Sequence, residues 1–153
     1  MTVFFRNVEG SIDDPVRTWP VEALAEVMER GLLQDWQPIL TELRHDPWGP
    51  VARKVERWVA QSPDDRASTY FALVIARVRE LAEAQERTEV ARRVRLAIDQ
   101  SGLTAAEFAS HIGTSASRLS TYANGRVIPS AALLLRIERV PDVMAGIAAE
   151  AQD

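Results

Sequence analysis

The chain has 153 residues, of which 46% are hydrophobic and 26% are charged, a composition typical of a folded globular protein. It contains no cysteine, which excludes disulfides and thiolate zinc sites and is consistent with a reducing compartment. No apolar run approaches the ~20 residues that span a bilayer, and the apolar segment in the opening "MTVFFRNVEG" is too short for a secretory signal. We therefore expect a cytoplasmic protein with no membrane partner.

The net charge of −4 is distributed unevenly along the sequence. Residues 1–87 carry 11 basic and 15 acidic side chains, whereas residues 88–140 carry seven arginines and four carboxylates. The basic segment is therefore small and lies within an acidic chain. Such a local excess of arginine can attract a polyanion even when the whole chain is acidic.

Helical spacing of apolar residues dominates the N-terminal half, where the one candidate strand is the short run Val3–Phe5. We expect a first helix between Pro20, in its opening turn, and Gly31. Its apolar face is formed by Leu24, Val27 and Met28. Two further helices, separated by the prolines of "RHDPWGP", are predicted from the sets Leu33, Trp36, Ile39, Leu40, Leu43 and Val51, Val55, Trp58, Val59.

A fourth helix is expected to begin at "SPDD", because Ser62 can cap it, Pro63 suits the first helical position, and the aspartates complement the helix dipole. Its apolar stripe consists of Phe71, Val74, Val78 and Leu81. This stripe fits either the core of a first domain or a seam between two chains. The polar run "EAQERTE" follows, and we place a domain boundary at about 86–90.

The sequence after this boundary predicts several short helices. The first has the apolar face Val90, Val94, Ala97 and Ile98 and stops at Ser101-Gly102. Thr104 and Glu107 then fit a capping box, and Phe108 and Ile112 are expected to point inward. Gly113 permits a left-handed turn, and either Thr114 or Ser115 can cap the next helix.

In that next helix Leu119 and Tyr122 are the expected core residues, and Asn124-Gly125 ends it because both residues tolerate positive φ. A last helix opens at Pro129-Ser130 with Leu133, Leu134 and Ile137 inward, and we expect Pro141 to limit it. The residues left outward between Ser115 and Tyr122 are short and uncharged apart from Arg118. A helix with such a face can enter the major groove of DNA, which is about 12 Å wide.

Residues 94–140 resemble the helix-turn-helix family of phage Cro and repressor proteins, often called the XRE family. The resemblance rests on "VRLAIDQSGLTAAEFASHIG", "TSASRLSTYANGR" and "IPSAALLLRI", which occur in this order. It implies a DNA-reading helix at about 115–123. By position, the resemblance implies base-edge contacts from Ala116, Ser117, Arg118, Ser120 and Thr121, and phosphate contacts from Arg95, Thr104, Ser115 and Arg126.

The sequence departs from the family at Ala105, Ala116 and Ala123, where longer polar residues are frequent. Arg118 is consequently the one side chain on this face suited to guanine O6 and N7. Specificity would then draw on thymine-methyl contacts from Ala116 or on DNA shape.

The other chemistry-bearing residues have simpler explanations. His45 and His111 lie far apart in sequence, so we expect no metal pair, although His111 could also touch a phosphate. The four tryptophans all lie in the first domain and fit either core packing or a partner surface. The Asp13-Asp14 and Asp64-Asp65 pairs fit turns and helix starts better than metal binding. We found no phosphate loop, nucleophile elbow or histidine base, so we expect neither an enzyme nor a cofactor.

The sequence as a whole predicts an all-α protein with three parts: an N-terminal helical domain (1–87), a five-helix lambda-repressor-like helix-turn-helix domain (88–140) and a tail (141–153). The first hypothesis is a sequence-specific transcriptional regulator, a homodimeric repressor that binds double-stranded DNA. The alternative is an antitoxin whose N-terminal domain neutralises a toxin while the second domain represses the shared operon. The layout is similar to that of an actinobacterial antitoxin-type regulator.

Overall fold

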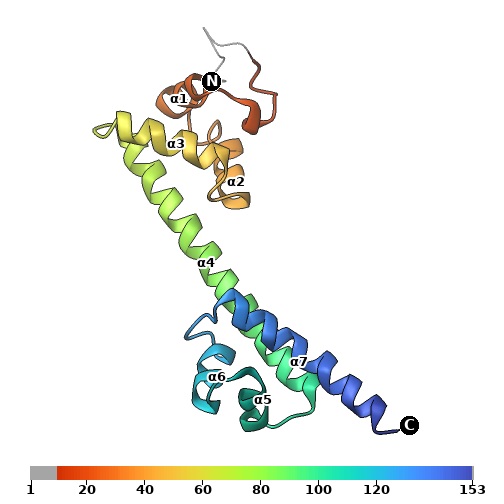
Figure 1. Ribbon diagram of the computed structural model, residues 1–153. Coiled ribbons are helices and arrows are strands. Elements are labelled where there is room, and N and C mark those ends of the chain that lie inside the picture. The colour runs from red at the N-terminus through yellow and green to blue at the C-terminus, as the bar shows by residue number, and fades with distance from the viewer. Residues whose placement is uncertain (1–9, 153) are drawn as a thin grey trace. The chain divides into compact units, whose positions relative to one another are not determined.

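The computed structural model describes residues 10–152, and these residues fold into helices and connecting loops (Figure 1). The expected strand at Val3–Phe5 lies outside the described residues. The helices, in chain order, are a short 3-10 helix η1 (Val16–Thr18), α1 (Val21–Arg30), α2 (Gln37–His45), α3 (Pro50–Gln61), α4 (Arg66–Ser101), α5 (Ala105–Ile112), α6 (Ala116–Ala123) and α7 (Ala131–Glu150). The expected all-α class is confirmed for this part of the chain.

The chain forms two compact units that divide between Ala82 and Glu83. The division falls within α4, which continues without interruption through the polar run 83–89 that the sequence analysis assigned to the region before a boundary. This run is helical because it consists of residues such as glutamate, alanine and glutamine that favour helices even when they are exposed. Each unit has its own hydrophobic core.

The core of the first unit is formed by α1, α2, α3 and the first half of α4. Leu24, Val27 and Met28 of α1 are fully buried, as the sequence predicted. From α4, however, the buried residues are Phe71, Ile75 and Val78, whereas Leu81 is 45% exposed. The predicted stripe was therefore correct at Phe71 and Val78 and wrong at Leu81, because the first unit ends beside that turn.

The tryptophans of the first unit have different environments. Trp19 and Trp58 are buried in the core, and Trp36 is partly buried with its indole N–H donating to the Val27 carbonyl at 2.9 Å. Trp48 is 43% exposed and lies under the guanidinium of Arg79, 5.9 Å from its ring centre. Core packing thus accounts for three of the four indoles.

The start of α4 differs from the prediction. Ser62 ends α3, since its N–H donates to the Trp58 carbonyl, and its own carbonyl accepts from Asp65 in a turn. The helix begins at Arg66, and the Asp65 carboxylate accepts from the Ala67 N–H at 2.7 Å as the capping group. Ser62 therefore cannot cap α4, because it already terminates the preceding helix.

The end of α7 also differs from the prediction, because the helix continues through Pro141 to Glu150. A proline inside a helix leaves one carbonyl without its N–H partner and costs about 3 kcal/mol. Val140 before it is buried and Met144 after it packs against the same core, so hydrophobic contacts on both sides offset that cost. Residues 141–150 are thus the last turns of α7 and not a separate tail.

We expect Phe71→Ala to destabilise the first unit by about 3–5 kcal/mol, because Phe71 is fully buried and contacts both Trp36 and Trp58. Leu73→Ala is the control, since Leu73 is 66% exposed and its truncation should change stability by about 0.5 kcal/mol or less. All four tryptophans belong to this unit, so urea unfolding followed by tryptophan fluorescence reports on it alone. Equal effects of the two substitutions would contradict the assigned core.

Candidate nucleic-acid interface

The second unit is built around a core that holds α5, α6 and α7 against the last turns of α4. The buried core residues are Val94, Ala97, Phe108, Ala109, Ile112, Leu119, Tyr122, Ile137 and Val140. Most of these positions were predicted from helical spacing. Ala91, which is 3% exposed, was missed because a single alanine gives no periodic signal.

The capping box predicted at the start of α5 is present. The Thr104 hydroxyl accepts from the Glu107 N–H at 3.3 Å, and the Glu107 carboxylate accepts from the Thr104 N–H at 2.8 Å and from its hydroxyl at 2.7 Å. These hydrogen bonds lower the pKa of Glu107, so its carboxylate is charged beside Thr104 at neutral pH. A phosphate at Thr104 would therefore approach a group that already holds a negative charge.

Gly113 forms the turn between α5 and α6 in the left-handed conformation, with φ of 76°. The Gly113 N–H donates to Ser110 and the Thr114 N–H donates to the Ala109 carbonyl at 2.9 Å, which is the pattern of a Schellman ending. A Cβ atom added at Gly113 would meet no atom within 4 Å. The requirement for glycine is therefore conformational and does not come from crowding.

Of the two capping candidates, Ser115 is the residue that caps α6. Its hydroxyl accepts from the Arg118 N–H at 3.2 Å. Its lone pairs are thus partly occupied by the helix that it starts, although the residue itself is exposed. Leu119 and Tyr122 of this helix are buried, as expected.

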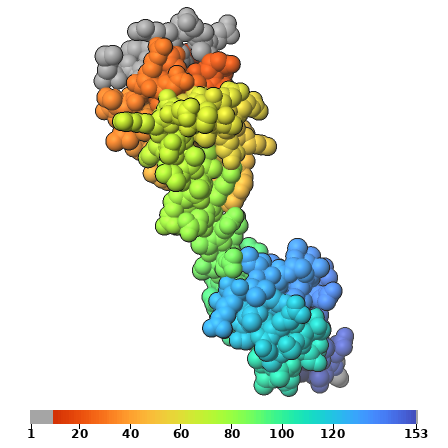
Figure 2. All heavy atoms as spheres, turned by 90° about the vertical axis from the view of Figure 1, so that its left-hand side faces the viewer, coloured from red at the N-terminus to blue at the C-terminus, as the bar shows by residue number. Residues whose placement is uncertain are grey.

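The predicted base-reading residues share one open surface on α6. Ala116, Ser117, Arg118 and Ser120 are exposed and Thr121 is half-buried. The atoms of α5, α6 and the loop after α6 form the face of the C-terminal unit that is turned toward the viewer in Figure 2. Within the described residues the Arg118 guanidinium has no hydrogen-bond or ion-pair partner, whereas the Thr121 hydroxyl donates to the Arg118 carbonyl at 2.7 Å.

The end of α6 is fixed by contacts with α4. Gly125 has a φ of 69°, whereas Asn124 has a φ of −92°, so the expected positive φ is confirmed for the glycine alone. A Cβ atom at Gly125 would lie 3.6 Å from the Ala91 side chain, so this turn passes close to α4. The Arg95 guanidinium donates to the Ala123 carbonyl, which satisfies a free carbonyl at the end of α6.

Some arginines of the second unit are held in ion pairs, and others are not. Arg92 and Arg93 are bound to Glu89, and their hydrogen bonds lower the pKa of this carboxyl group to about 2. Arg93 also lies 3.6 Å from Glu138. In the part of the chain that the structure describes, no ion pair involves Arg118, Arg126, Arg136 or Arg139, and these four are free to meet an anion.

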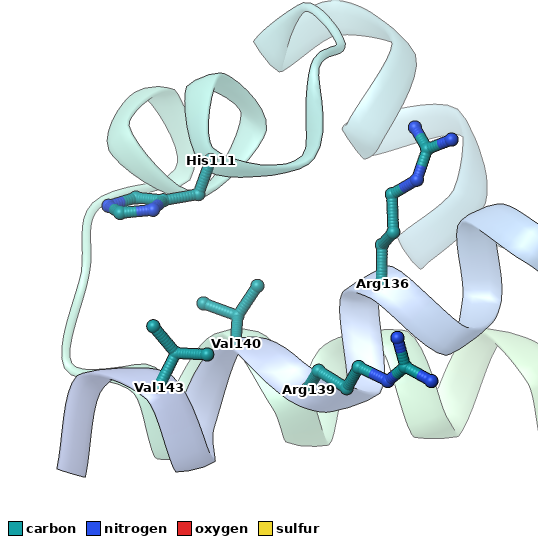
Figure 3. A pocket seen from close by; sticks show the side chains of 5 residues that line it. All are labelled: His111, Arg136, Arg139, Val140 and Val143. Atoms are coloured by element: carbon teal, nitrogen blue, oxygen red, sulfur yellow. The ribbon is translucent and has the colours of Figure 1, made fainter. Parts of the chain in front are cut away.

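The two histidines are in separate units, and the described residues contain no cluster of three or more metal-ligating side chains. His111 lies at the end of α5 and lines a hollow of about 180 Å³ together with Arg136, Arg139, Val140 and Val143 of α7 (Figure 3). The sequence analysis missed this hollow, because its two sides are about 25 residues apart in the chain. No helix among the described residues is long and apolar enough to cross a membrane.

The comparisons with known proteins identify the second unit. Residues 75–143 match a family model described as a helix-turn-helix domain, and this domain is of the XRE/Cro-like type. The match includes α5, the Gly113 turn, α6 and most of α7. It indicates a DNA-binding regulator. No curated protein and no solved structure is similar enough to the chain to count as a match.

We expect Gly113→Ala to destabilise the second unit by about 1 kcal/mol, because an L residue at positive φ costs about 1–2 kcal/mol and the loss of glycine flexibility recovers part of that. Gly146→Ala is the matched control, since Gly146 is inside α7 and a Cβ there also meets no atom within 4 Å. This second change should stabilise by about 0.5–1 kcal/mol. Unfolding followed by circular dichroism compares them, and shifts in the same direction would contradict the conformational explanation.

Proposed function

We propose that this protein, whose residues 75–143 form an XRE/Cro-type helix-turn-helix domain, is a sequence-specific transcriptional repressor that reads the major groove with α6. The single observation that carries the proposal is the composition of the open face of α6. It presents short side chains and one free guanidinium, on a helix held from below by buried Leu119 and Tyr122. Such a face can approach base edges closely, and Arg118 is the one charged side chain of α6 that would enter the groove.

We assign the polar residues on and around α6 to two kinds of contact, with bases and with phosphates. Arg118 is the residue suited to a bidentate contact with guanine. The short side chains of Ser117, Ser120 and Thr121 can form hydrogen bonds with neighbouring bases that lie closer to α6. Arg126 follows the Gly125 turn and is exposed and without an ion-pair partner among the described residues, which suits a phosphate contact. Arg95 has one nitrogen occupied by the Ala123 carbonyl, so it would act on a phosphate through its remaining donors.

The proposed repressor acts as a homodimer. A single α6 covers few base pairs, and helix-turn-helix dimers gain specificity by reading two half-sites about one helical turn apart. The proposal includes no catalytic step and no cofactor. Selection of bound sequences from random DNA should return a pseudo-palindromic site, and binding that shows no sequence preference at any salt concentration would refute it.

The first unit supports a second candidate function, that of an antitoxin. Leu32 and Leu33 are 56% and 64% exposed and precede Trp36 by three or four residues, and Leu73 is 66% exposed and follows Tyr70 by three residues; the ring centres of Trp36 and Tyr70 are 5.2 Å apart. Large apolar side chains exposed on a surface can contribute to a site for another protein. A neighbouring gene whose product is toxic alone, and harmless when expressed with this chain, would favour the antitoxin.

We expect Arg118→Ala to relax preference at one base pair of each half-site by about 1–3 kcal/mol, because one bidentate contact is lost. Affinity for unrelated DNA should change little. Competition between the selected site and its single-base variants measures this. Arg53→Ala is the control, since Arg53 is an exposed arginine of the first unit. Unchanged preference at every position would show that Arg118 does not read a base.

Arg126→Ala should have a different effect, namely weaker binding to all sequences alike. Loss of one phosphate contact releases about one fewer counterion, so the slope of log K against log salt should become less steep by about 1. Titration of selected and unrelated DNA over a range of salt concentrations measures both quantities. A loss confined to the selected site would instead place Arg126 at a base edge.

A further inference from the structure

The last turns of α7 form an apolar helix end that the second unit does not cover. Residues 141–150 contain two charged side chains, Asp142 and Glu150. Val143 is 53% exposed and Ile147 is 51% exposed, whereas the neighbouring Met144 packs against the core. An exposed helix without a clear polar face is typical of a segment that packs against another element.

The exposed residues of α7 follow the spacing of a helix–helix seam. Arg136, Val143, Ile147 and Glu150 are exposed and are separated by steps of seven, four and three residues. Val140 lies on the same line of the helix, but it is buried in the core and belongs to the seam only through the hollow that it lines. These steps follow the heptad spacing that aligns side chains along one face of a helix for pairing with another helix. The seam has a basic residue at its N-terminal end, an acidic residue at its C-terminal end and aliphatic residues between them.

The hollow beside α7 lies on this same seam. Val140 and Val143 line it from α7, His111 lines it from the end of α5, and Arg136 and Arg139 lie at its edge (Figure 3). Its volume is about 180 Å³. An occupant that fits must therefore offer an aliphatic group to the valines and a carboxylate to the arginines.

We propose that α7 pairs antiparallel with α7 of a second copy of this chain, with Ile147 of each copy seated in the hollow of the other. When the two-fold axis lies near Val143, Arg136 and Glu150 are each seven residues from it and on opposite sides. Glu150 of one copy then meets Arg136 of the other, and Ile147 falls opposite Arg139 and Val140. The same helix thus supplies both the aliphatic group and the carboxylate that the hollow requires.

Self-complementarity favours a second copy over an unrelated protein. In an antiparallel pair of identical helices, the basic end of each helix lies beside the acidic end of the other, so all four charged ends are paired. An unrelated protein would have to supply its own charged groups at matching positions. Arg136, Arg139 and Glu150 have no ion-pair partners within the described residues, so they are available for this contact. The inference deepens the homodimer of the proposed function and names the surface on which that dimer rests.

The test measures the mass of the full chain in the absence of DNA by sedimentation equilibrium across the micromolar range. The native chain should show twice its 17.0 kDa, and Ile147→Lys should return the mass to 17.0 kDa because it places a cation between the valines and beside the arginines of the hollow. Ala149→Lys is the matched control. It adds the same charge to an exposed position in the same turn, on the side of α7 away from the seam, and should leave the dimer intact.

A charge exchange tests the register independently of any effect on folding. Arg136→Glu alone and Glu150→Arg alone should each weaken the dimer about tenfold, since each creates two like-charge contacts. The double variant restores both pairs with reversed sign and should recover native association. Circular dichroism confirms that each variant has the native helix content.

Three results would overturn the pairing: a native chain that stays at 17.0 kDa throughout the range, an Ile147→Lys variant that remains dimeric, or a double charge exchange that fails to restore association. A monomeric native chain would mean that the exposed face of α7 pairs with a different protein and not with a second copy. These outcomes are separate from the proposed function, because none of the measurements contains DNA. A dimer that fails to bind any DNA would refute the repressor and leave the α7 pairing in place.

Discussion

The left-handed turn at Gly113 is the constraint on which the second unit depends. It redirects the chain between α5 and α6 within a few residues, so that Phe108 and Ile112 on one side and Leu119 and Tyr122 on the other enter a single core. Once these four residues are buried, the opposite face of α6 has to point to solvent. The open surface that we assign to DNA therefore results from core packing, and the residues on it are free to vary in chemistry.

Residues distant in sequence then hold α6 at both ends. Its start is fixed locally by Ser115, but its end depends on α4, where Arg95 binds the Ala123 carbonyl and Ala91 leaves room for the Gly125 turn. Arg95, which the resemblance places on a phosphate, therefore also holds the end of α6 in position. Position 91 requires a small residue because the Gly125 turn passes close to it, whereas the long cationic residue at position 95 reaches the Ala123 carbonyl.

The features that the sequence predicted are those decided by neighbouring residues. The capping box at Thr104, the glycine turn and the start of α7 after Ser130 each depend on hydrogen bonds between groups within five residues of one another, so the local sequence is enough to predict them. The predicted start of α4 and the predicted end of α7 were wrong because other interactions outweighed the local signals. Ser62 already terminates α3, and core contacts on both sides of Pro141 stabilise the continued helix α7. The hollow between α5 and α7 could not be predicted, since it depends on how the two helices pack.

The distribution of ion pairs explains how an acidic chain can attract DNA. Net charge counts Arg92 and Arg93 as cations, but Glu89 already neutralises part of their field and its pKa of about 2 keeps it charged at physiological pH. The attraction must then come from the few arginines without partners among the described residues. Because Arg136 and Arg139 line the hollow beside α7, they belong to the proposed dimer contact, and the duplex is left with Arg118, Arg126 and the remaining donors of Arg95. With so few phosphate contacts in each chain, a monomer would bind DNA weakly, and pairing two chains would double the contacts on one duplex.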